Sequence, residues 1–557
     1  MGHFFLIKIG LLIAAIFFVP KAALAKKPAA KTLKKSKVKG KAKAKTKVKK
    51  RVKAKIGKKA AALKAAAEFD RLYEMYQKNV MKEKPLWIKL VEIEPKLDNK
   101  RQIKLLTLKA DLLEKEKLYV LSAVYASRAI KKIKQISSDD AQKSFAALHR
   151  LSQKIPIQFL LEDIALSGNL KSKIPPHFGN DWNYIVANAH NAKGKKKNAY
   201  SYYKRVNHAS RYYMPSRYQM AMIDFSAGKF KAAKAALGAI LTGTARNISP
   251  LAMKDKDQMW DYANMALGRI HYQQKKFLTA ARYFRRVHKK SPVYYDALFE
   301  QSWALFMSGN PQHALGSLYG SSSSFFEDIY NPEVKVLESI IYFWMCRYDD
   351  SRNSLADFAE SYSKSVSSLG KFLSGKSLTP QSAYTMFENL VAGVSSRSLG
   401  VPREVLRSAA TRDTMLLVRD QLATVMVEAD RVKKRGIFGN FTGIDAPYKI
   451  ITDIQKTLKR HLGEKFILEL KAEKEHYEDL HSQAQFLYLE LIMSEKEQIL
   501  GRELHGASKV DRVADASSIR GWGRNTQSWM AEAKGEYWWD ELGFHIVNVE
   551  PRCVARK

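Results

Sequence analysis

The sequence has little cysteine and no long apolar segment. Its 557 residues contain two cysteines, Cys346 and Cys553, and no paired Cys-x-x-Cys motif, which argues against a cysteine-based metal centre. The apolar run nearest the N-terminus, residues 9–19, is much shorter than the roughly 20 residues that a membrane-spanning helix needs, and no other run is long enough. A protein with several spanning helices is therefore excluded.

The state of the two cysteines is open from sequence alone. In an oxidising compartment they could form a disulfide. Cys346, however, lies in the stretch IIYFWMCRY, which predicts the apolar face of a helix. We therefore expect Cys346 to be a small buried thiol, with a disulfide as the alternative.

Complete catalytic motifs are also missing, including His-Glu-x-x-His and Gly-x-Ser-x-Gly. Residues 370–377, GKFLSGKS, formally match the phosphate-binding loop GxxxxGK(S/T). That loop needs a buried strand before it and a helix directly after it. The preceding SYSKSVSSL is not an apolar strand, and the next helix is expected only near Pro380. We therefore predict a solvated linker here rather than a nucleotide site.

One metal-ligand pair remains. Glu478 and His481 form a single Glu-x-x-His pair, whereas helical di-metal sites need two such pairs and two further carboxylates. We interpret this pair as part of a solvated helix face. The sequence thus predicts no enzyme, no cofactor and no metal site.

Acidic residues are scarce: 54 Asp and Glu stand against 96 Lys and Arg, for a formal net charge of +42. Residues 26–59 hold 17 Lys and one Arg without a single acid. Such a segment cannot bury enough apolar surface to offset the cost of ordering, so we expect a disordered tail that contacts anionic material. Candidates are phospholipid head groups, lipopolysaccharide phosphates, an acidic cell-wall polymer or an acidic protein region.

Residues 1–25 have the pattern of a secretory signal peptide. Lys8 precedes the apolar run, and Ala23-Leu24-Ala25 has the small-x-small pattern of a cleavage site. We therefore predict export to the periplasm or envelope. The alternative is an uncleaved anchor with the body in the cytoplasm, because positive charge after an apolar segment tends to stay on the cytoplasmic side.

What the sequence does contain is a repeat. Residues 194–206 align with 228–240 after a shift of 34 residues, with 275–287 after a further 47, and with 309–320 after 34 more. Weaker copies lie at 103–130 and 339–358. Small residues recur at two aligned positions: Ala187, Ala221, Gly268 and Ser302 in the first helix, and Ala199, Ala233, Ala280 and Ala314 in the second. A 34-residue period of paired helices resembles the tetratricopeptide (TPR) family, although that family's first-helix Trp is missing.

We predict an all-α fold: a TPR-like α-solenoid followed by a long antiparallel helical hairpin, with a disordered Lys-rich N-terminal tail. In the second hairpin helix, Tyr477, Leu480, Ala484, Leu487 and Leu491 form a coiled-coil seam. The expected segments are a signal peptide (1–25), a basic tail (26–59), degenerate helical repeats (60–180), the TPR-like array (181–360), a linker with a short helix (361–400), the hairpin (401–505) and a Trp-rich C-terminal segment (506–557).

The resemblance also implies a binding surface. In TPR proteins the first helices line the concave face, and aromatic side chains with a few polar groups suit a protein partner. The alternative is that these side chains only pack between repeats. The positions concerned are Tyr184, Asn188, Tyr218, Phe225, Arg269, Tyr272, Phe299, Trp303 and Phe306.

Together these features predict a non-enzymatic scaffold for protein–protein interaction in the bacterial cell envelope, similar to the TPR proteins of Gram-negative envelope machinery. One alternative is a nucleic-acid-associated protein with a histone-like tail, because a polybasic tail also binds phosphates. Another is a membrane-anchored cytoplasmic TPR adaptor. The sequence does not name the partner.

Overall fold

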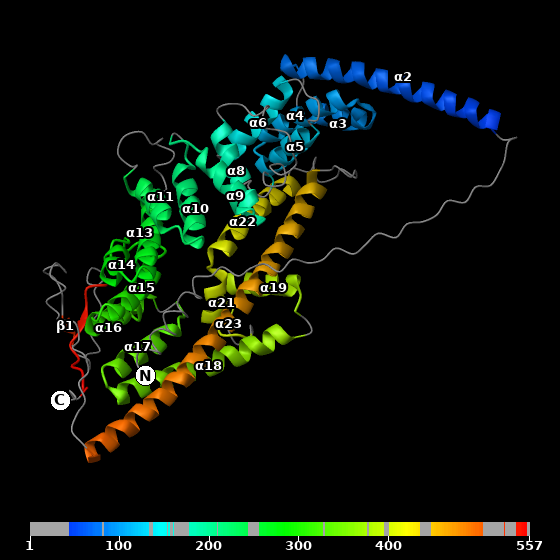
Figure 1. The fold of residues 1–557 in the computed structure, drawn as a ribbon. Coiled ribbons are helices and arrows are strands. Elements are labelled where there is room, and N and C mark those ends of the chain that lie inside the picture. The colour runs from blue at the N-terminus through cyan, green and yellow to red at the C-terminus, as the bar shows by residue number, and fades with distance from the viewer. Residues whose placement is uncertain are drawn as a thin grey trace. The chain divides into compact units, whose positions relative to one another are not determined.

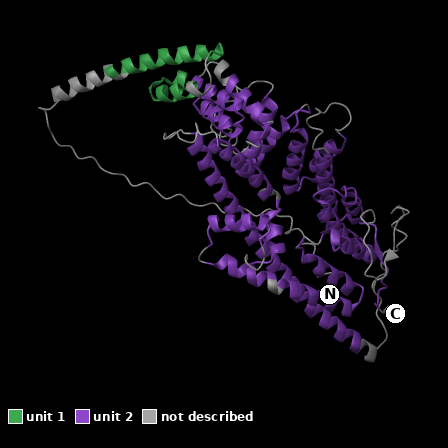
Figure 2. Cartoon of the chain, turned by 180° about the vertical axis from the view of Figure 1, so that it is seen from behind, with its two compact units in different colours: residues 1–102 green, residues 103–557 purple. Residues whose placement is uncertain are grey.

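A computed structural model describes most of the chain from residue 44 onward. The chain divides into two compact units, residues 1–102 and 103–557, which are coloured separately in Figure 2. The predicted signal peptide and residues 26–43 lie outside the described residues. The residues described are 44–80, 83–132, 138–152, 154–155, 160, 178–208, 210–242, 256–326, 329–375, 378–394, 400–434, 447–504, 528–529 and 542–553.

Unit 1 is helical, and Phe69 and Trp87 are among its buried side chains. Its first helix corrects one prediction. We expect a disordered tail over residues 26–59, but from Ala44 onward this segment belongs to that helix, because Lys and Ala are both strong helix formers. The elements are α2 (Ala44–Gln77), α3 (Glu83–Ile93), the 3-10 helix η1 (Glu94–Lys96) and the start of α4 (Asn99–Lys115).

Unit 2 consists of helix pairs followed by a long helical hairpin (Figure 1). We call α8–α9 repeat 1, α10–α11 repeat 2, α13–α14 repeat 3, α15–α16 repeat 4 and α17–α18 repeat 5, with α4–α5 as the leading pair. The predicted loop 242–254 lies outside the described residues except for Thr242. The elements are α5 (Tyr119–Lys131), α6 (Ser138–Ser152), α8 (Gly179–Ala192), α9 (Lys196–Lys204), α10 (Tyr213–Ser226), α11 (Phe230–Thr242), α13 (Lys256–Gln273), α14 (Phe277–Phe284), α15 (Tyr294–Met307), α16 (Pro311–Ser321), η4 (Ser324–Phe326), α17 (Glu333–Trp344), α18 (Tyr348–Ser374), α19 (Pro380–Val391), α21 (Arg403–Ala410), α22 (Asp413–Lys434), α23 (Pro447–Leu504), β1 (Ser528–Trp529) and β2 (Ile546–Val547).

The same turn joins the two helices of the leading pair and of repeats 1 to 5. One residue of the turn has a left-handed backbone, and its N–H and the next N–H both return to carbonyls of the first helix. In repeat 1, Gly194 N–H donates to Asn191 O and Lys195 N–H donates to His190 O, both at 2.9 Å. The left-handed residues are Lys117, Gly194, Gly228, Lys275, Gly309 and Cys346.

Small buried side chains lie where the two helices of each pair touch. The Ser122 hydroxyl donates to Ala110 O at 2.7 Å, and a Cβ added at Gly268 would lie 2.4 Å from the Phe284 ring. Close approach of two helix axes requires such small residues. The fold is a TPR-like α-solenoid. The small positions are Ala110, Ala187, Ala221, Gly268, Ser302 and Ser339 before the turn, and Ser122, Ala199, Ala233, Ala280, Ala314 and Ser351 after it.

Helices α22 and α23 form the antiparallel hairpin (Figure 1). Its first arm is interrupted at Thr411 and Arg412, which separate α21 from α22. Glu428 of α22 connects the hairpin to the leading pair, since its carboxylate accepts the N–H groups of Val120 and Leu121, each at 2.8 Å. Burial raises the pKa of Glu428 to about 7.

The predicted coiled-coil seam lies on the second half of α23 and is buried. It packs against repeat 5 rather than against α22. The Tyr477 ring meets Tyr330, just before α17, with ring centroids 5.7 Å apart, and His481 stacks on Tyr362 of α18 at 4.4 Å. Helix α23 therefore continues past its hairpin partner and runs along the end of the array.

The C-terminal strap, which we define as residues 542–553, lies against repeat 4. It contains β2, which pairs in parallel with β1 and places Ile546 opposite Ser528. Near its end, Arg552 N–H donates to Met345 O at 2.8 Å, and Cys553 is disulfide-bonded to Cys346.

The disulfide corrects our expectation of a buried thiol at Cys346. Helix α17 ends at Trp344, so Cys346 is not on its apolar face. It is instead the left-handed residue (φ 56°) of the α17–α18 turn, where it is half-buried and bonded to Cys553. The apolar residues before it gave no sign that the helix stops two residues earlier.

The phosphate-loop match and the Glu-x-x-His pair have structural roles. The predicted linker is wrong for residues 370–374, which continue α18, while α19 begins at Pro380 as expected. A helix therefore stands where a phosphate-binding loop requires a strand, and Lys376 and Ser377 lie outside the described residues. Glu478 pairs with Lys474, while His481 stacks on Tyr362. In the described part of the chain, no three or more His, Cys, Asp or Glu side chains are grouped as a metal site would need. Nor does any described helix have the length and apolar character to cross a membrane.

Candidate partner-binding surfaces of the repeat array

The first two predicted binding residues, Tyr184 and Asn188, lie on α8 in repeat 1. The Tyr184 ring stacks on the Tyr212 ring with centroids 4.4 Å apart, and the Tyr203 hydroxyl donates to Asn188 Oδ1 at 2.6 Å. Burial raises the pKa of Tyr184. Tyr184 thus reaches the start of repeat 2, whereas Asn188 bonds within repeat 1, and both half-buried side chains still present part of their surface.

Tyr218 and Phe225 lie on α10 in repeat 2, where Tyr218 aligns with Tyr184 and Phe225 aligns with Asn191. The Tyr218 ring lies 5.9 Å from the Tyr262 ring of α13, and the Phe225 ring lies 6.1 Å from the Phe230 ring of α11. Both pack against the apolar cluster shared by repeats 2 and 3. Like the residues of repeat 1, they are half-buried.

Arg269 and Tyr272 lie one turn apart on α13. Arg269 forms a two-pronged ion pair with Glu300 of α15, with Nε–Oε2 at 2.9 Å and Nη2–Oε1 at 2.5 Å. The Tyr272 ring packs edge-on against Phe277, and its hydroxyl is buried without a hydrogen-bond partner among the described residues. Burial raises the pKa of Tyr272, and the nearby carboxylates of Glu333 and Glu300 raise it further.

The last three predicted residues lie on α15 in repeat 4. Phe299 is half-buried, whereas Trp303 and Phe306 are only 8% and 6% exposed. The Phe306 ring meets the Trp344 ring of α17 edge-on at 6.0 Å, and the Trp303 side chain lies next to Glu333 of α17. These two side chains therefore join repeat 4 to repeat 5.

The nine residues occupy repeat-equivalent positions on four first helices. Seven of them are half-buried, and only Trp303 and Phe306 of repeat 4 are buried. Packing between repeats accounts for Trp303 and Phe306. The half-buried aromatic residues of repeats 1 to 3 are the better candidates for contact with a partner, and that role stays a prediction.

A second surface was not predicted: a row of lysines on the turns of repeats 1 to 3. The residue after each left-handed turn residue is Lys195, Lys229 or Lys276, and all three are exposed. Asn310 and Arg347 take this place in repeats 4 and 5. An alignment of the repeats at the left-handed turn residue would have shown from the sequence that lysines recur beside it. The lysine edge, as we call it, comprises Lys193, Lys195, Lys196, Lys197, Lys229, Lys231, Lys275 and Lys276.

The lysine edge continues from one repeat to the next. The Lys196 ammonium donates to Ser226 Oγ at the end of α10 (3.0 Å), and Lys234 donates to Gln274 Oε1 at the end of α13 (3.1 Å). Between residues 182 and 295 the only acids are Asp224, Asp255, Asp257 and Asp261. Among the described residues, no acidic side chain forms an ion pair with a member of the lysine edge. The positive charges of neighbouring repeats therefore add rather than cancel.

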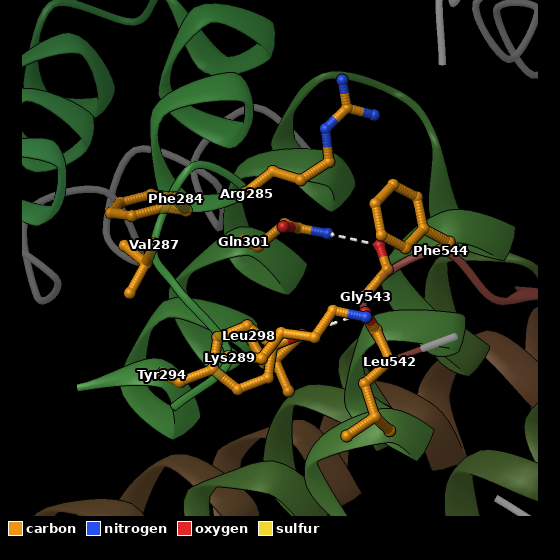
Figure 3. Close-up of a pocket in the computed structure, with 10 residues that line it drawn as sticks. All are labelled: Phe284, Arg285, Val287, Lys289, Tyr294, Leu298, Gln301, Leu542, Gly543 and Phe544. Carbon is orange, nitrogen blue, oxygen red and sulfur yellow. Dashed lines mark hydrogen bonds between the residues drawn. The ribbon is translucent and has the colours of Figure 1, made fainter. Parts of the chain in front are cut away.

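The C-terminal strap covers repeat 4 and encloses a small cavity of about 70 Å³ beside it (Figure 3). Tyr294 donates its hydroxyl to Leu542 O at 2.9 Å, and Gln301 Nε2 donates to Gly543 O at 3.1 Å. The Arg285 guanidinium and the Lys289 ammonium lie 5.7 and 5.5 Å from the centre of the Phe544 ring. The cavity is too small for a drug-sized ligand, and we interpret it as a packing space under the strap.

No protein-family model matches the chain, and no curated protein matches it either. Among solved structures, a chain in the crystal structure of the APC/C hetero-tetramer Cut9-Hcn1 is similar at 12% identity, covering 75% of this chain and 84% of that chain with a TM-score of 0.20. A TM-score this low carries no argument, so the assignment of the fold rests on the repeated turn and the paired small residues.

Proposed function

We propose that the chain is a non-enzymatic scaffold of the bacterial cell envelope. In this proposal the first helices of repeats 1 to 3 hold a protein partner, while the lysine edge and the Lys-rich N-terminal segment contact anionic material. The observation that carries the proposal is the lysine edge. It is a continuous row of lysines on a TPR-like fold, and no acidic side chain among the described residues forms an ion pair with any of them.

Support for a protein partner comes from the half-buried aromatic residues. Tyr184, Tyr218 and Phe225 are held in place by stacked or packed rings, so little side-chain entropy remains to be lost on binding. Rigid aromatic side chains with one exposed side are the usual anchors of protein interfaces. Export and an envelope location are supported by the pattern of residues 1–25 alone.

The protein partner is tested by crosslinking pull-down from cells that express the full-length chain. We expect the double variant Tyr184→Ala/Phe225→Ala to recover about tenfold less partner, which corresponds to a loss of about 1.4 kcal/mol. Leu417→Ala is the matched control, because Leu417 is an exposed apolar residue on α22, away from the array. Equal recovery by both variants would refute the proposed partner-binding surface on the first helices of repeats 1 to 3.

The anionic contact is tested by sedimentation with anionic and neutral vesicles and by titration with polyglutamate. The triple variant Lys195→Glu/Lys229→Glu/Lys276→Glu should lose most of the binding, and binding by the parent should weaken as salt rises. Undiminished binding by the triple variant would assign the anionic contact to the N-terminal segment instead of the lysine edge.

The alternative of a nucleic-acid-associated protein predicts a different location rather than a different affinity, since both readings predict binding to phosphates. Cell fractionation and mass spectrometry of the mature N-terminus decide between them. A chain that begins at Lys26 in the envelope fraction supports export. An intact Met1 or Gly2 would instead support the cytoplasmic adaptor or the nucleic-acid-associated protein.

A further inference from the structure

The C-terminal strap shows how an extended segment lies on a second helix of the array. Gln312 Nε2 donates to Val549 O at 3.0 Å near the start of α16, and His545 lies against Gly316 one turn further along. The strap therefore runs antiparallel to α16. We define the strap path as the helix positions that lie three, seven and eleven residues after the left-handed turn residue. In repeat 4 these positions are Gln312, Gly316 and Gly320.

The same path is basic in repeats 1 and 3. It carries two basic residues in each of these repeats and one in repeat 2, and all of them are exposed. None of its positions is acidic, and among the described residues no acid forms an ion pair with its Lys or Arg side chains. In repeat 4, by contrast, the path is neutral and holds the strap. The path residues are Lys197, Ser201 and Arg205 in repeat 1, Lys231, Ala235 and Ala239 in repeat 2, and Leu278, Arg282 and Arg286 in repeat 3.

Two arginines of the path are held in place by aromatic rings. The Arg286 guanidinium lies 5.0 Å from the centre of the Tyr283 ring, and that ring stacks on the His271 ring at 5.2 Å. In repeat 1, the Arg205 guanidinium lies 4.8 Å from the centre of the Tyr202 ring. An arginine held over a ring loses less side-chain entropy on binding and keeps its N–H groups for a planar carboxylate. Both arginines are therefore prepared to bind an acidic side chain.

The spacing of the arginines in repeat 3 matches that of an extended peptide. Arg282 and Arg286 are one helical turn apart, which is about 6 Å along the helix. Alternate side chains of an extended chain lie on the same side at a separation of about 6.6 Å. Acids at every second residue can therefore meet both arginines at once.

We propose that the strap path of repeat 3 binds an extended segment of a partner protein that has Asp or Glu at every second residue. The segment lies on α14 as the strap lies on α16, with successive carboxylates on Arg282 and Arg286. In repeat 1 the path offers a further contact of the same kind through Arg205. The proposal rests on the proposed contact of repeats 1 to 3 with anionic material and names the chemistry of that contact.

Two peptides of equal length and charge test this spacing. One alternates Glu and Thr, and the other repeats Glu-Glu-Thr-Thr, which never places acids at two successive positions on the same side. In fluorescence anisotropy titrations, we expect the full-length parent to bind the alternating peptide roughly threefold more tightly, because the other peptide meets only one of the two arginines at a time. Arg282→Gln/Arg286→Gln should bind the alternating peptide about tenfold more weakly than the parent and should lose the preference.

A matched control variant is Lys456→Gln/Arg460→Gln. Lys456 and Arg460 are also exposed and one turn apart, but they lie on α23. This variant should keep both the affinity and the preference of the parent. The Lys-rich N-terminal segment adds the same background to every variant, and thermal melts check that each variant is folded.

Equal binding of the two peptides by the parent, or an unchanged preference in Arg282→Gln/Arg286→Gln, would overturn the proposal. If vesicle binding still depends on Lys195, Lys229 and Lys276 in that case, the lysine edge stands and only the peptide site is wrong. If the parent binds neither peptide nor anionic vesicles, the proposed anionic contact is itself refuted. A loss of vesicle binding without a loss of peptide binding in the arginine variant would assign the path to a lipid surface, which equally overturns the peptide site.

Discussion

All five repeats have the same helix–turn–helix backbone. Repeats 1 to 3 are exposed at positions where repeats 4 and 5 are covered by other parts of the chain. At the position seven residues after the turn, repeats 1, 2 and 3 expose Ser201, Ala235 and Arg282, whereas repeat 4 buries Gly316 under the C-terminal strap. Repeat 5 is in turn covered by α23. Among the described residues, no segment covers this position in the first three repeats, whereas the last two repeats are covered by the chain itself.

The difference shows how one repeat can serve two purposes. Lysines at the turns keep repeats 1 to 3 solvated and positive, while small or neutral residues at the same places let the strap approach repeat 4. A partner-binding surface is therefore expected in the first part of the array, and stability in the second.

The largest effect should come from opening the Cys346–Cys553 disulfide, which closes a loop with a sequence separation of 207. Such a long loop gains much entropy when the bond is lost, so Cys346→Ser should reduce the free energy of unfolding by about 2–5 kcal/mol. Denaturant unfolding measures the loss. Cys553→Ser must show the same loss, and a double variant that loses markedly more would contradict the pairing.

The second effect compares two helical glycines with opposite surroundings. A Cβ at Gly316 would lie 1.9 Å from His545 O, whereas a Cβ at Gly238 in repeat 2 meets nothing within 4 Å. Gly316→Ala should therefore displace the strap and destabilise the chain by about 1–3 kcal/mol. Gly238→Ala should stabilise its helix by about 0.5–1 kcal/mol. Thermal melts measure both changes in stability. If both variants shift the melting temperature in the same direction, the contrast between a covered Gly316 and an open Gly238 is refuted.

The repeats were predictable from sequence because each helix pair needs small residues at fixed places. Ala199 and Gly268 mark that need without any knowledge of the fold. The strap was not predictable, because Gly316 and His545 are far apart in the sequence and no periodic pattern links them. For Trp303 the sequence left two readings open, contact with a partner or packing between repeats, because the residues that cover it belong to the next repeat.

The third effect is a pH dependence that belongs to the covered repeats. Burial, with a smaller contribution from nearby Glu300, raises the pKa of Glu333 to about 7 from an ordinary value of 4.5. Because the folded state holds this proton more tightly, the contribution is complete below pH 4.5 and is lost as pH rises through about 7.

Glu333→Gln should therefore flatten the fall in melting temperature between pH 5 and pH 8, read at one-unit steps, and should raise stability at pH 8. The exposed Glu475→Gln serves as the control and should keep the parent profile. A Glu333→Gln variant that still loses stability over this range, as the parent does, would assign the pH dependence to another group.

The smallest effect tests the turn itself. Lys275 has a left-handed backbone (φ 58°) at the place where repeats 1, 2 and 4 have glycine. Side chains with a Cβ disfavour that conformation by about 1 kcal/mol, so Lys275→Gly should relieve strain and stabilise repeat 3 by up to that amount. The reverse exchange, Gly228→Lys in repeat 2, should cost about the same in thermal melts. Because Lys275 belongs to the lysine edge, Lys275→Gly should also weaken polyglutamate binding slightly while raising stability. A variant that loses both stability and binding would mean that this turn depends on the lysine side chain rather than tolerating it.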